Sequence, residues 1–214
     1  DAVAVLDAKR SDSIYPYEHL SGCGVGFKFM QAFAKSNNFP FSDLEKLLEL
    51  TAVSIASDIV PITGENRILA YYGLKQLNSN PSLGLKGIID ICGLTGKEIT
   101  IGDIVFNFGP RINASGRKMN GKEAVELLLS KDSASAREKS ESINQYNEER
   151  RELDKKITDE ANAVIDEVEN MDDRKAIVVY NPGWHKGVIG IVASRLTEKY
   201  YRPAVVLTKS SELL

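Results

Sequence analysis

The sequence predicts an α/β protein in which one long helix joins two parts of unequal size. Ala176–Tyr180 and Ala204–Leu207 are rich in β-branched residues and flank an apolar-faced helix, Gly187–Tyr201. This order is typical of a β-α-β unit with parallel strands. Residues 133–170 contain neither glycine nor proline, which favours a single long helix. Residues 1–132 consist mainly of short apolar segments with helical spacing.

The composition is that of a folded protein with a substantial core. The chain has 214 residues, of which 43% are hydrophobic and 27% charged. Its formal net charge of −3 argues against binding nucleic acid by bulk charge, so any anion site must be local. Cys23 and Cys92 lie far apart, which supports neither a zinc site nor a disulfide framework. No apolar run reaches the length of a membrane span. We expect reduced cysteines and a cytoplasmic location.

The N-terminal part is expected to be helical after one short strand. Val3–Leu6 is an apolar run before a charged turn and predicts the end of a buried strand. Residues 98–109 predict a helical turn followed by an apolar segment that fits a strand or a helix. Apolar residues at helical spacing predict helices from Val25 onward, over Phe41–Val60, over residues 64–79, over residues 84–92 and over Lys122–Leu129.

The long helix, Ser133–Asn170, is dense in charged residues and carries one narrow apolar stripe. As a single helix it would be about 55 Å long. The stripe consists of Ile143, Tyr146, Leu153, Ile157, Ala161, Val164 and Val168. Such a helix suits a strut between two lobes, and a homodimeric coiled coil is the alternative. Arg150 stands where the stripe requires an apolar residue, which favours the strut and a monomer.

The stretch GPRINASGRKMNGK, residues 109–122, holds four cationic residues and no acid. Its asparagine, glycine and proline residues predict a loop. Arginine presents planar donors that match phosphate oxygens, so Arg111 and Arg117 are candidate phosphate ligands. Asn113 and Ser115 are candidate neutral donors beside them. The alternative is a solvated turn whose arginines pair with acids of the long helix.

A second cationic stretch, GWHKGVIGIVASR, lies where a predicted strand leads into a helix. Ligands of open α/β sheets bind at such junctions. The amides of a helix beginning at Gly187 would face a phosphate, Trp184 would stack on a base, and His185 and Lys186 would lie beside the strand. The alternatives are core packing for Trp184 and a loop hydrogen bond for His185.

Two acids lie in the apolar passage LLELTAVSIASDIVP. A buried acid is costly unless a metal or a base accompanies it, so Glu49 is a candidate metal ligand. Asp58 is expected to fix the turn before Pro61 instead. For each acid the alternative is a capping or solvent-facing role. No complete catalytic motif is present, and two histidines cannot build a histidine-rich metal centre.

The stretches SGCGVGFK, VSIASDIVPITGENRIL, GPRINASGR and WHKGVIGIVASRL, in this order, resemble the RecJ family of single-stranded-DNA-specific exonucleases. That family belongs to the DHH phosphoesterase superfamily, and the resemblance covers nearly the whole chain. It implies that residues 1–132 are the C-terminal part of a DHH domain. Residues 133–170 would then be the connecting helix and residues 171–214 the start of an incomplete DHH-associated domain. We therefore expect an internal piece of a longer protein.

The resemblance implies a nuclease, dependent on Mn²⁺ or Mg²⁺, that removes nucleotides from the 5′ end of single-stranded DNA in repair and recombination. The family's metal ligands fall before Asp1, except at position 49, where this chain has Glu instead of Asp. The chain alone is therefore expected to be inactive. Arg111 and Arg117 would neutralise phosphates near the 5′ end, and residues 184–186 would guide the strand. Other repair proteins are possible partners.

Two other functions stay open at this point. One is a different DHH phosphoesterase, acting on short oligonucleotides or cyclic dinucleotides. The other is a non-catalytic scaffold that has lost its metal ligands, for which Glu49 gives some support. An intact Asp-His-His motif before Asp1 would exclude the scaffold.

Overall fold

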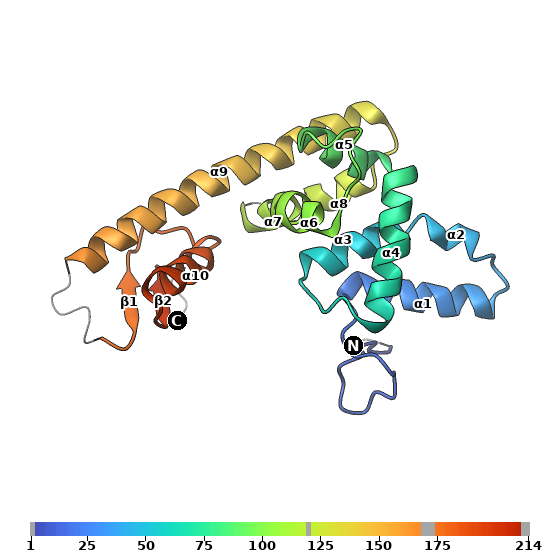
Figure 1. Cartoon of the computed structure of the whole chain (residues 1–214), viewed down its shortest axis with the longest axis horizontal. Coiled ribbons are helices and arrows are strands. Elements are labelled where there is room, and N and C mark those ends of the chain that lie inside the picture. Colours follow the sequence, from blue (N-terminus) through green and yellow to red (C-terminus); the bar gives the residue numbers. More distant parts are fainter. Residues whose placement is uncertain (1–2, 119–120, 168–173, 211–214) are drawn as a thin grey trace.

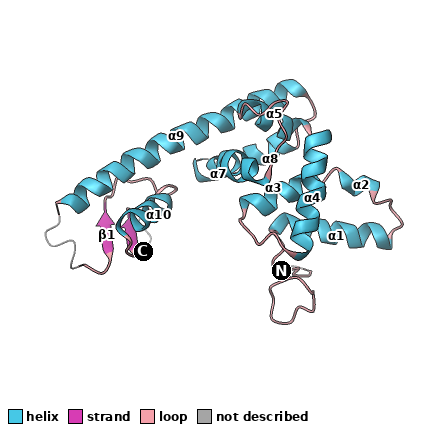
Figure 2. Ribbon diagram, viewed as in Figure 1, coloured by secondary structure: helices cyan, strands magenta, loops and turns pink. Residues whose placement is uncertain are grey.

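The computed structural model describes residues 3–118, 121–167 and 174–210. This part of the chain is mostly helical and holds one parallel sheet of two strands (Figure 1, Figure 2). None of the described helices is long and apolar enough to cross a membrane. The elements are, in chain order, α1 (Gly22–Ser36), α2 (Ser42–Glu45), α3 (Leu48–Ser57), α4 (Gly64–Ser79), α5 (Leu83–Ile91), α6 (Ile101–Asp103), the π-helical turn η1 (Ile104–Phe108), α7 (Gly109–Lys118), α8 (Lys122–Leu128), α9 (Ser133–Asp166), β1 (Ile177–Tyr180), α10 (Ile189–Tyr200) and β2 (Ala204–Leu207).

Helix α9 runs along one side of the whole structure (Figure 1). The N-terminal lobe, made of α1 to α8, packs on the first half of α9, and the C-terminal unit, made of β1, α10 and β2, packs on the second half. Helices α7 and α10 both contact α9 and lie on the same side of it in this view. The helix therefore sets where these two elements stand relative to each other.

The first helix begins earlier than the sequence predicts. Ser21 is its N-cap and accepts a hydrogen bond from the Gly24 N–H at 3.1 Å, so α1 starts before Val25. The predicted strand at Val3–Leu6 is wrong, because these residues are exposed and form no strand. A strand needs a partner, and the sheet in the described part pairs only β1 with β2.

The helix predicted over Phe41–Val60 is divided into α2 and α3. Leu44 and Leu48, which lie on either side of the break, are buried in one cluster with Phe27 of α1. Helix α3 ends before Pro61, since Ile59 takes a left-handed conformation with φ of 52°. Helix α4 follows and matches the prediction for residues 64–79.

The predicted loop over residues 109–122 is wrong as far as Lys118, because Gly109–Lys118 is helix α7. Helices α6, η1 and α7 form one continuous helical segment. The Gly109 N–H donates to the Ile104 carbonyl, five residues back, and Pro110, which has no N–H to donate, follows directly. Phe108 and Ala114 are fully buried. Tertiary packing thus holds a helix that the glycine, proline and asparagine content disfavours.

Helix α9 confirms the long helix within the described residues; positions 168–170 of the prediction lie outside them. Asp132 caps its start by accepting from the Ser135 N–H at 2.8 Å. Ile143 is buried in the N-terminal lobe and Ile157 in the C-terminal unit, as the strut interpretation requires. The prediction for Val164 is wrong: it is 42% exposed, and Ile165 is buried in its place.

The C-terminal unit has the predicted β-α-β order and parallel pairing. The register runs from Ile177 opposite Ala204 to Tyr180 opposite Leu207. One face of the sheet is buried together with α9 and α10, and the other face is exposed. The exposed face carries Val178, Tyr180, Val205 and Leu207.

Helices α3 and α4 approach each other closely at Gly73, which gives a test of the fold. A Cβ atom at this position would collide with the Leu48 carbonyl oxygen and lie 2.6 Å from the Ala52 Cβ. We expect Gly73→Ala to destabilise the protein by about 1–3 kcal/mol. Gly26→Ala in α1 is the matched control, because a Cβ there meets nothing within 4 Å. Chemical denaturation measures both, and equal stability of the two variants would contradict this packing.

Candidate nucleic-acid interface

Arg111 of α7 is held by neutral acceptors. Its Nε donates to the Asn144 side-chain oxygen of α9 at 2.9 Å, and its Nη1 donates to the Asn107 carbonyl at 2.9 Å. Asn144 donates in turn to Glu148 at 2.9 Å. Within the described residues Arg111 forms no salt bridge, so it does not pair with an acid of the long helix. Its guanidinium is oriented and keeps an uncancelled positive charge.

The other candidates of the cationic stretch are divided by the helix. Asn113 is exposed. Ser115 is fully buried, so the prediction that it donates to a ligand at the surface is wrong. The Arg117 side chain lies outside the described residues. Positions 111 and 117 are six residues apart, which places them about 120° apart around a helix axis. Positions 113 and 117 share a face. Positions 111 and 117 therefore lie on different faces of α7.

Trp184 is part of the core of the C-terminal unit. It is 4% exposed, and its indole N–H donates to Glu160 of α9 at 2.8 Å. Its carbonyl accepts from the Thr208 hydroxyl at 2.6 Å. The ring therefore presents no face on which a base could stack, and the structure replaces the predicted stacking role with core packing.

The neighbours of Trp184 are exposed. The His185 Nδ1 accepts from the Gly187 N–H at 3.1 Å, which is the loop hydrogen bond foreseen as the alternative. Helix α10 begins at Ile189 rather than Gly187, so the predicted phosphate site on the Gly187 amide is wrong: that amide is already bonded. Lys186 is exposed and forms no salt bridge among the described residues.

The sequence analysis did not predict an ion pair that joins helices α9 and α10. Arg195 of α10 donates to Asp154 of α9 at 2.6 Å, and the side chains are 52% and 1% exposed. A signal for it exists in the sequence. Asp154 continues the three-and-four spacing of the buried stripe, and a buried carboxylate requires a cation or several donors.

Glu49 caps another helix. It is 2% exposed, and both of its carboxylate oxygens accept from the Ser82 N–H at the start of α5, at 3.1 and 3.2 Å. Burial raises the pKa of the Glu49 carboxyl, although the hydrogen bonds from Ser82 oppose this. The described residues contain no group of three His, Cys, Asp or Glu that could hold a metal. Glu49 in this arrangement does not fit a metal centre.

Asp58 takes the alternative role, a solvent-facing acid at the end of a helix. It is the C-cap of α3, is exposed and accepts from the Ser54 hydroxyl at 3.1 Å. It lies directly before Ile59, where the chain turns toward Pro61.

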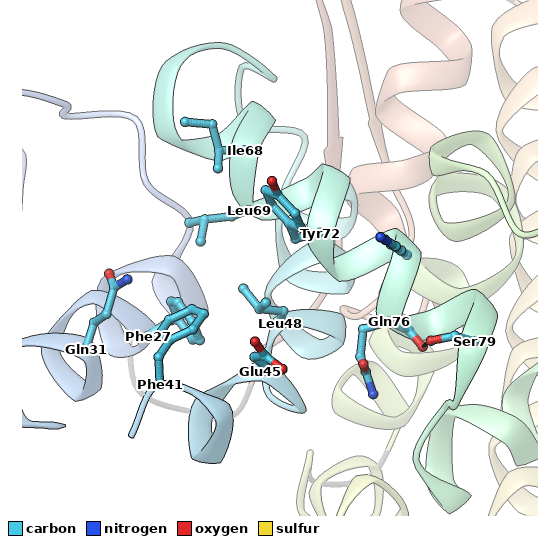
Figure 3. Close-up of a pocket in the computed structure, with 11 residues that line it drawn as sticks. Phe27, Gln31, Phe41, Glu45, Leu48, Ile68, Leu69, Tyr72, Gln76 and Ser79 are labelled. Carbon is cyan, nitrogen blue, oxygen red and sulfur yellow. Dashed lines mark hydrogen bonds between the residues drawn. The ribbon is translucent and has the colours of Figure 1, made fainter. Parts of the chain in front are cut away.

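A groove of about 450 Å³ opens between α1, α2, α3 and α4 (Figure 3). Its wall is mainly aromatic and aliphatic, with Phe27, Phe41, Leu48 and Tyr72 around it. None of the predicted site residues lines it. The groove therefore does not belong to the candidate interface, which consists of Arg111 and Asn113 on α7 and of His185 and Lys186 before α10.

No family model matches the chain. The single-stranded-DNA-specific exonuclease RecJ of Bacillus subtilis is 41% identical over 208 residues, which cover 97% of this chain and 25% of that protein. The structure of RecJ from Thermus thermophilus in complex with Mg²⁺ superposes with a TM-score of 0.80 and 29% identity, over 91% of this chain and 30% of that chain. A structure of exonuclease RecJ bound to manganese superposes with a TM-score of 0.75 and 30% identity, over 86% of this chain and 46% of that chain.

The agreement in sequence and fold extends over nearly the whole chain, but the chain spans only about a quarter of the Bacillus subtilis protein. The resemblance carried by the four sequence stretches is thereby confirmed. The chain is homologous to the RecJ single-stranded-DNA-specific exonucleases and corresponds to part of their length.

Proposed function

We propose that the protein containing this chain is a RecJ-like 5′-to-3′ exonuclease for single-stranded DNA, and that this chain contributes binding of the strand and its phosphates. Homology across 97% of the chain supports the substrate class. In this proposal residues 1–132 are the C-terminal part of a DHH domain, 133–170 connect the domains, and 171–214 begin a DHH-associated domain.

The main support for strand binding by this chain is the orientation of the Arg111 guanidinium. Two neutral acceptors fix the guanidinium on the α9 side of α7 without cancelling its charge. A phosphate oxygen would find prepositioned donors there, at little cost in side-chain entropy. Asn113 is exposed on a different face of the same helix, and Lys186 is exposed before α10. A strand contacting Arg111 and Lys186 would follow the side of α9 on which α7 and α10 lie (Figure 1).

We assign binding to this chain and derive no hydrolytic step for it. RecJ relatives have been solved with Mg²⁺ and with manganese, but Glu49 is engaged with the start of α5 and does not fit such a centre. Ser115 and Trp184 are assigned structural roles because they are buried.

Strand binding by Arg111 is tested by fluorescence anisotropy with a 3′-labelled single-stranded oligonucleotide. We expect Arg111→Ala to bind the strand several-fold more weakly. Because one phosphate contact is lost, the slope of log affinity against log salt concentration should become shallower by about 0.7. Oligonucleotides with and without a 5′ phosphate show whether that contact lies at the strand end. Arg137→Ala is the matched control, because Arg137 is exposed on α9 and paired with Glu141. Equal affinity of the two variants would make Arg111 a structural residue.

The absence of hydrolysis by this chain alone is tested with the same oligonucleotide. We expect it to stay intact after prolonged incubation with Mn²⁺ or Mg²⁺, because the described residues form no group that could hold a metal. Denaturing gel electrophoresis measures the product lengths. Stepwise shortening that EDTA stops would refute this expectation.

The role of Glu49 is tested by the pH dependence of stability. Because its pKa is raised by burial, the folded state binds the proton more tightly, and stability is lost as pH rises above the ordinary Glu value. Relative to the unmodified chain, Glu49→Gln should therefore gain stability from about pH 4 to pH 7. Urea denaturation at both pH values measures this difference. If Glu49→Gln instead lost stability relative to the unmodified chain as the pH rises, the ionised Glu49 carboxylate would have a stabilising partner in the folded state.

A further inference from the structure

The buried face of α9 is mainly apolar at both ends and polar at its centre. Its inward positions recur every three or four residues and consist of Ala136, Ser140, Ile143, Asn147, Arg150, Asp154, Ile157, Ala161 and Ile165. The positions at both ends are mainly apolar and belong to the two cores, whereas the three central ones are polar. The polar centre lies between the N-terminal lobe and the C-terminal unit, where neither core provides an apolar wall.

Asp154 is the most constrained of the three central residues. Its side chain is 1% exposed, and Oδ2 accepts from the Arg195 Nη2 at 2.6 Å. Its other oxygen, Oδ1, is buried and has no hydrogen-bond partner in the described part of the chain. A buried carboxylate of this kind depends strongly on its single cation. Asp154 therefore holds one terminal nitrogen, Nη2, of the Arg195 guanidinium.

The rest of the Arg195 guanidinium faces solvent. The side chain is 52% exposed, and the pair with Asp154 is its only salt bridge in the described residues. Arg151, exposed on α9 one turn before Asp154, forms no salt bridge there either. An arginine bonded through one terminal nitrogen still has donors on its other nitrogens, and part of its rotamer entropy has already been lost. Such a group suits a phosphate oxygen.

Arg195 and Arg111 both contact α9, although the partner of Arg111 is neutral and the partner of Arg195 is a carboxylate. Arg111 reaches α9 from α7 and bonds Asn144, and Arg195 reaches α9 from α10 and bonds Asp154. The two acceptors are ten residues apart, about 15 Å along the helix axis. That distance corresponds to roughly four to five stacked nucleotides at 3.4 Å each. One strand is therefore long enough to contact both arginines.

We propose that Arg195 is a second phosphate contact for single-stranded DNA, held in position by Asp154 at the polar centre of α9. This inference rests on the proposed function and adds a strand-binding residue on α10 to the one on α7. Asp154 acts as a positioning residue. It lies behind the guanidinium and does not meet the strand itself.

The test removes the ion pair without leaving a buried charge. Asp154→Asn/Arg195→Gln replaces both members by neutral polar side chains, Asn with the shape of Asp and Gln shorter than Arg, so no buried charge is left without a partner and the fold is expected to be retained. Anisotropy titrations over a range of salt concentrations should show binding that is several-fold weaker, with the slope of log affinity against log salt reduced by about 0.7. The matched control is Arg137→Gln/Glu141→Gln, which removes one exposed ion pair from the same long helix and should bind like the unmodified chain.

The outcomes separate this inference from the proposed function. If the double variant at 154 and 195 binds like the control, Arg195 only stabilises the fold, and the inference fails while the proposed function stands. If the unmodified chain shows no salt-dependent binding, both fail. Circular dichroism verifies folding. Should the double variant not fold, Asp154→Leu/Arg195→Met decides: it replaces the ion pair by apolar side chains and removes the cation, and binding equal to that of the control would overturn the inference.

Discussion

The arrangement of this structure depends on one helix being shared by two cores. Ile143 packs with the apolar residues of the N-terminal lobe, and Ile157 and Ala161 pack with those of the C-terminal unit. A highly charged helix of this kind owes its stability chiefly to tertiary packing rather than to propensity. Each core therefore stabilises one half of α9, and the rigid helix fixes the spacing of α7 and α10. The candidate interface exists because of that spacing.

The polar centre of α9 follows from the same constraint. Between two cores there is no apolar partner, so the inward positions must carry groups that find hydrogen bonds. Arg150 donates to Asn147 within the helix at 3.1 Å, while Oδ2 of Asp154 and the side-chain oxygen of Asn144 accept from arginines of other elements. At Asn144 and Asp154 the helix thus supplies the acceptor, and α7 and α10 supply an arginine.

The sequence predicts the parts of the fold that follow from local patterns. The parallel pairing of β1 with β2 and most of α9 follow from β-branched runs and from spacing, and both are observed. Helix α7 could not be predicted in this way, because burial of Phe108 and Ala114 outweighs an unfavourable composition. Glu49 was assigned to a metal for a sound reason, the cost of burying an acid. Its actual partner, the Ser82 N–H, lies 33 residues away and has no signature in the sequence.

The shared motifs do not translate residue by residue into contacts with DNA. Within GPRINASGR, Ala114 and Ser115 are buried and hold the helix in place, while Arg111 and Asn113 remain available to a ligand. Within WHKGVIGIVASR, Trp184 is buried in the core, and Arg195, at the end of the stretch, is half exposed. In both motifs the arginine that contacts α9 keeps donors for an anion. Similarity to RecJ therefore identifies the family, whereas burial and hydrogen bonding decide which residues of these stretches a ligand can reach.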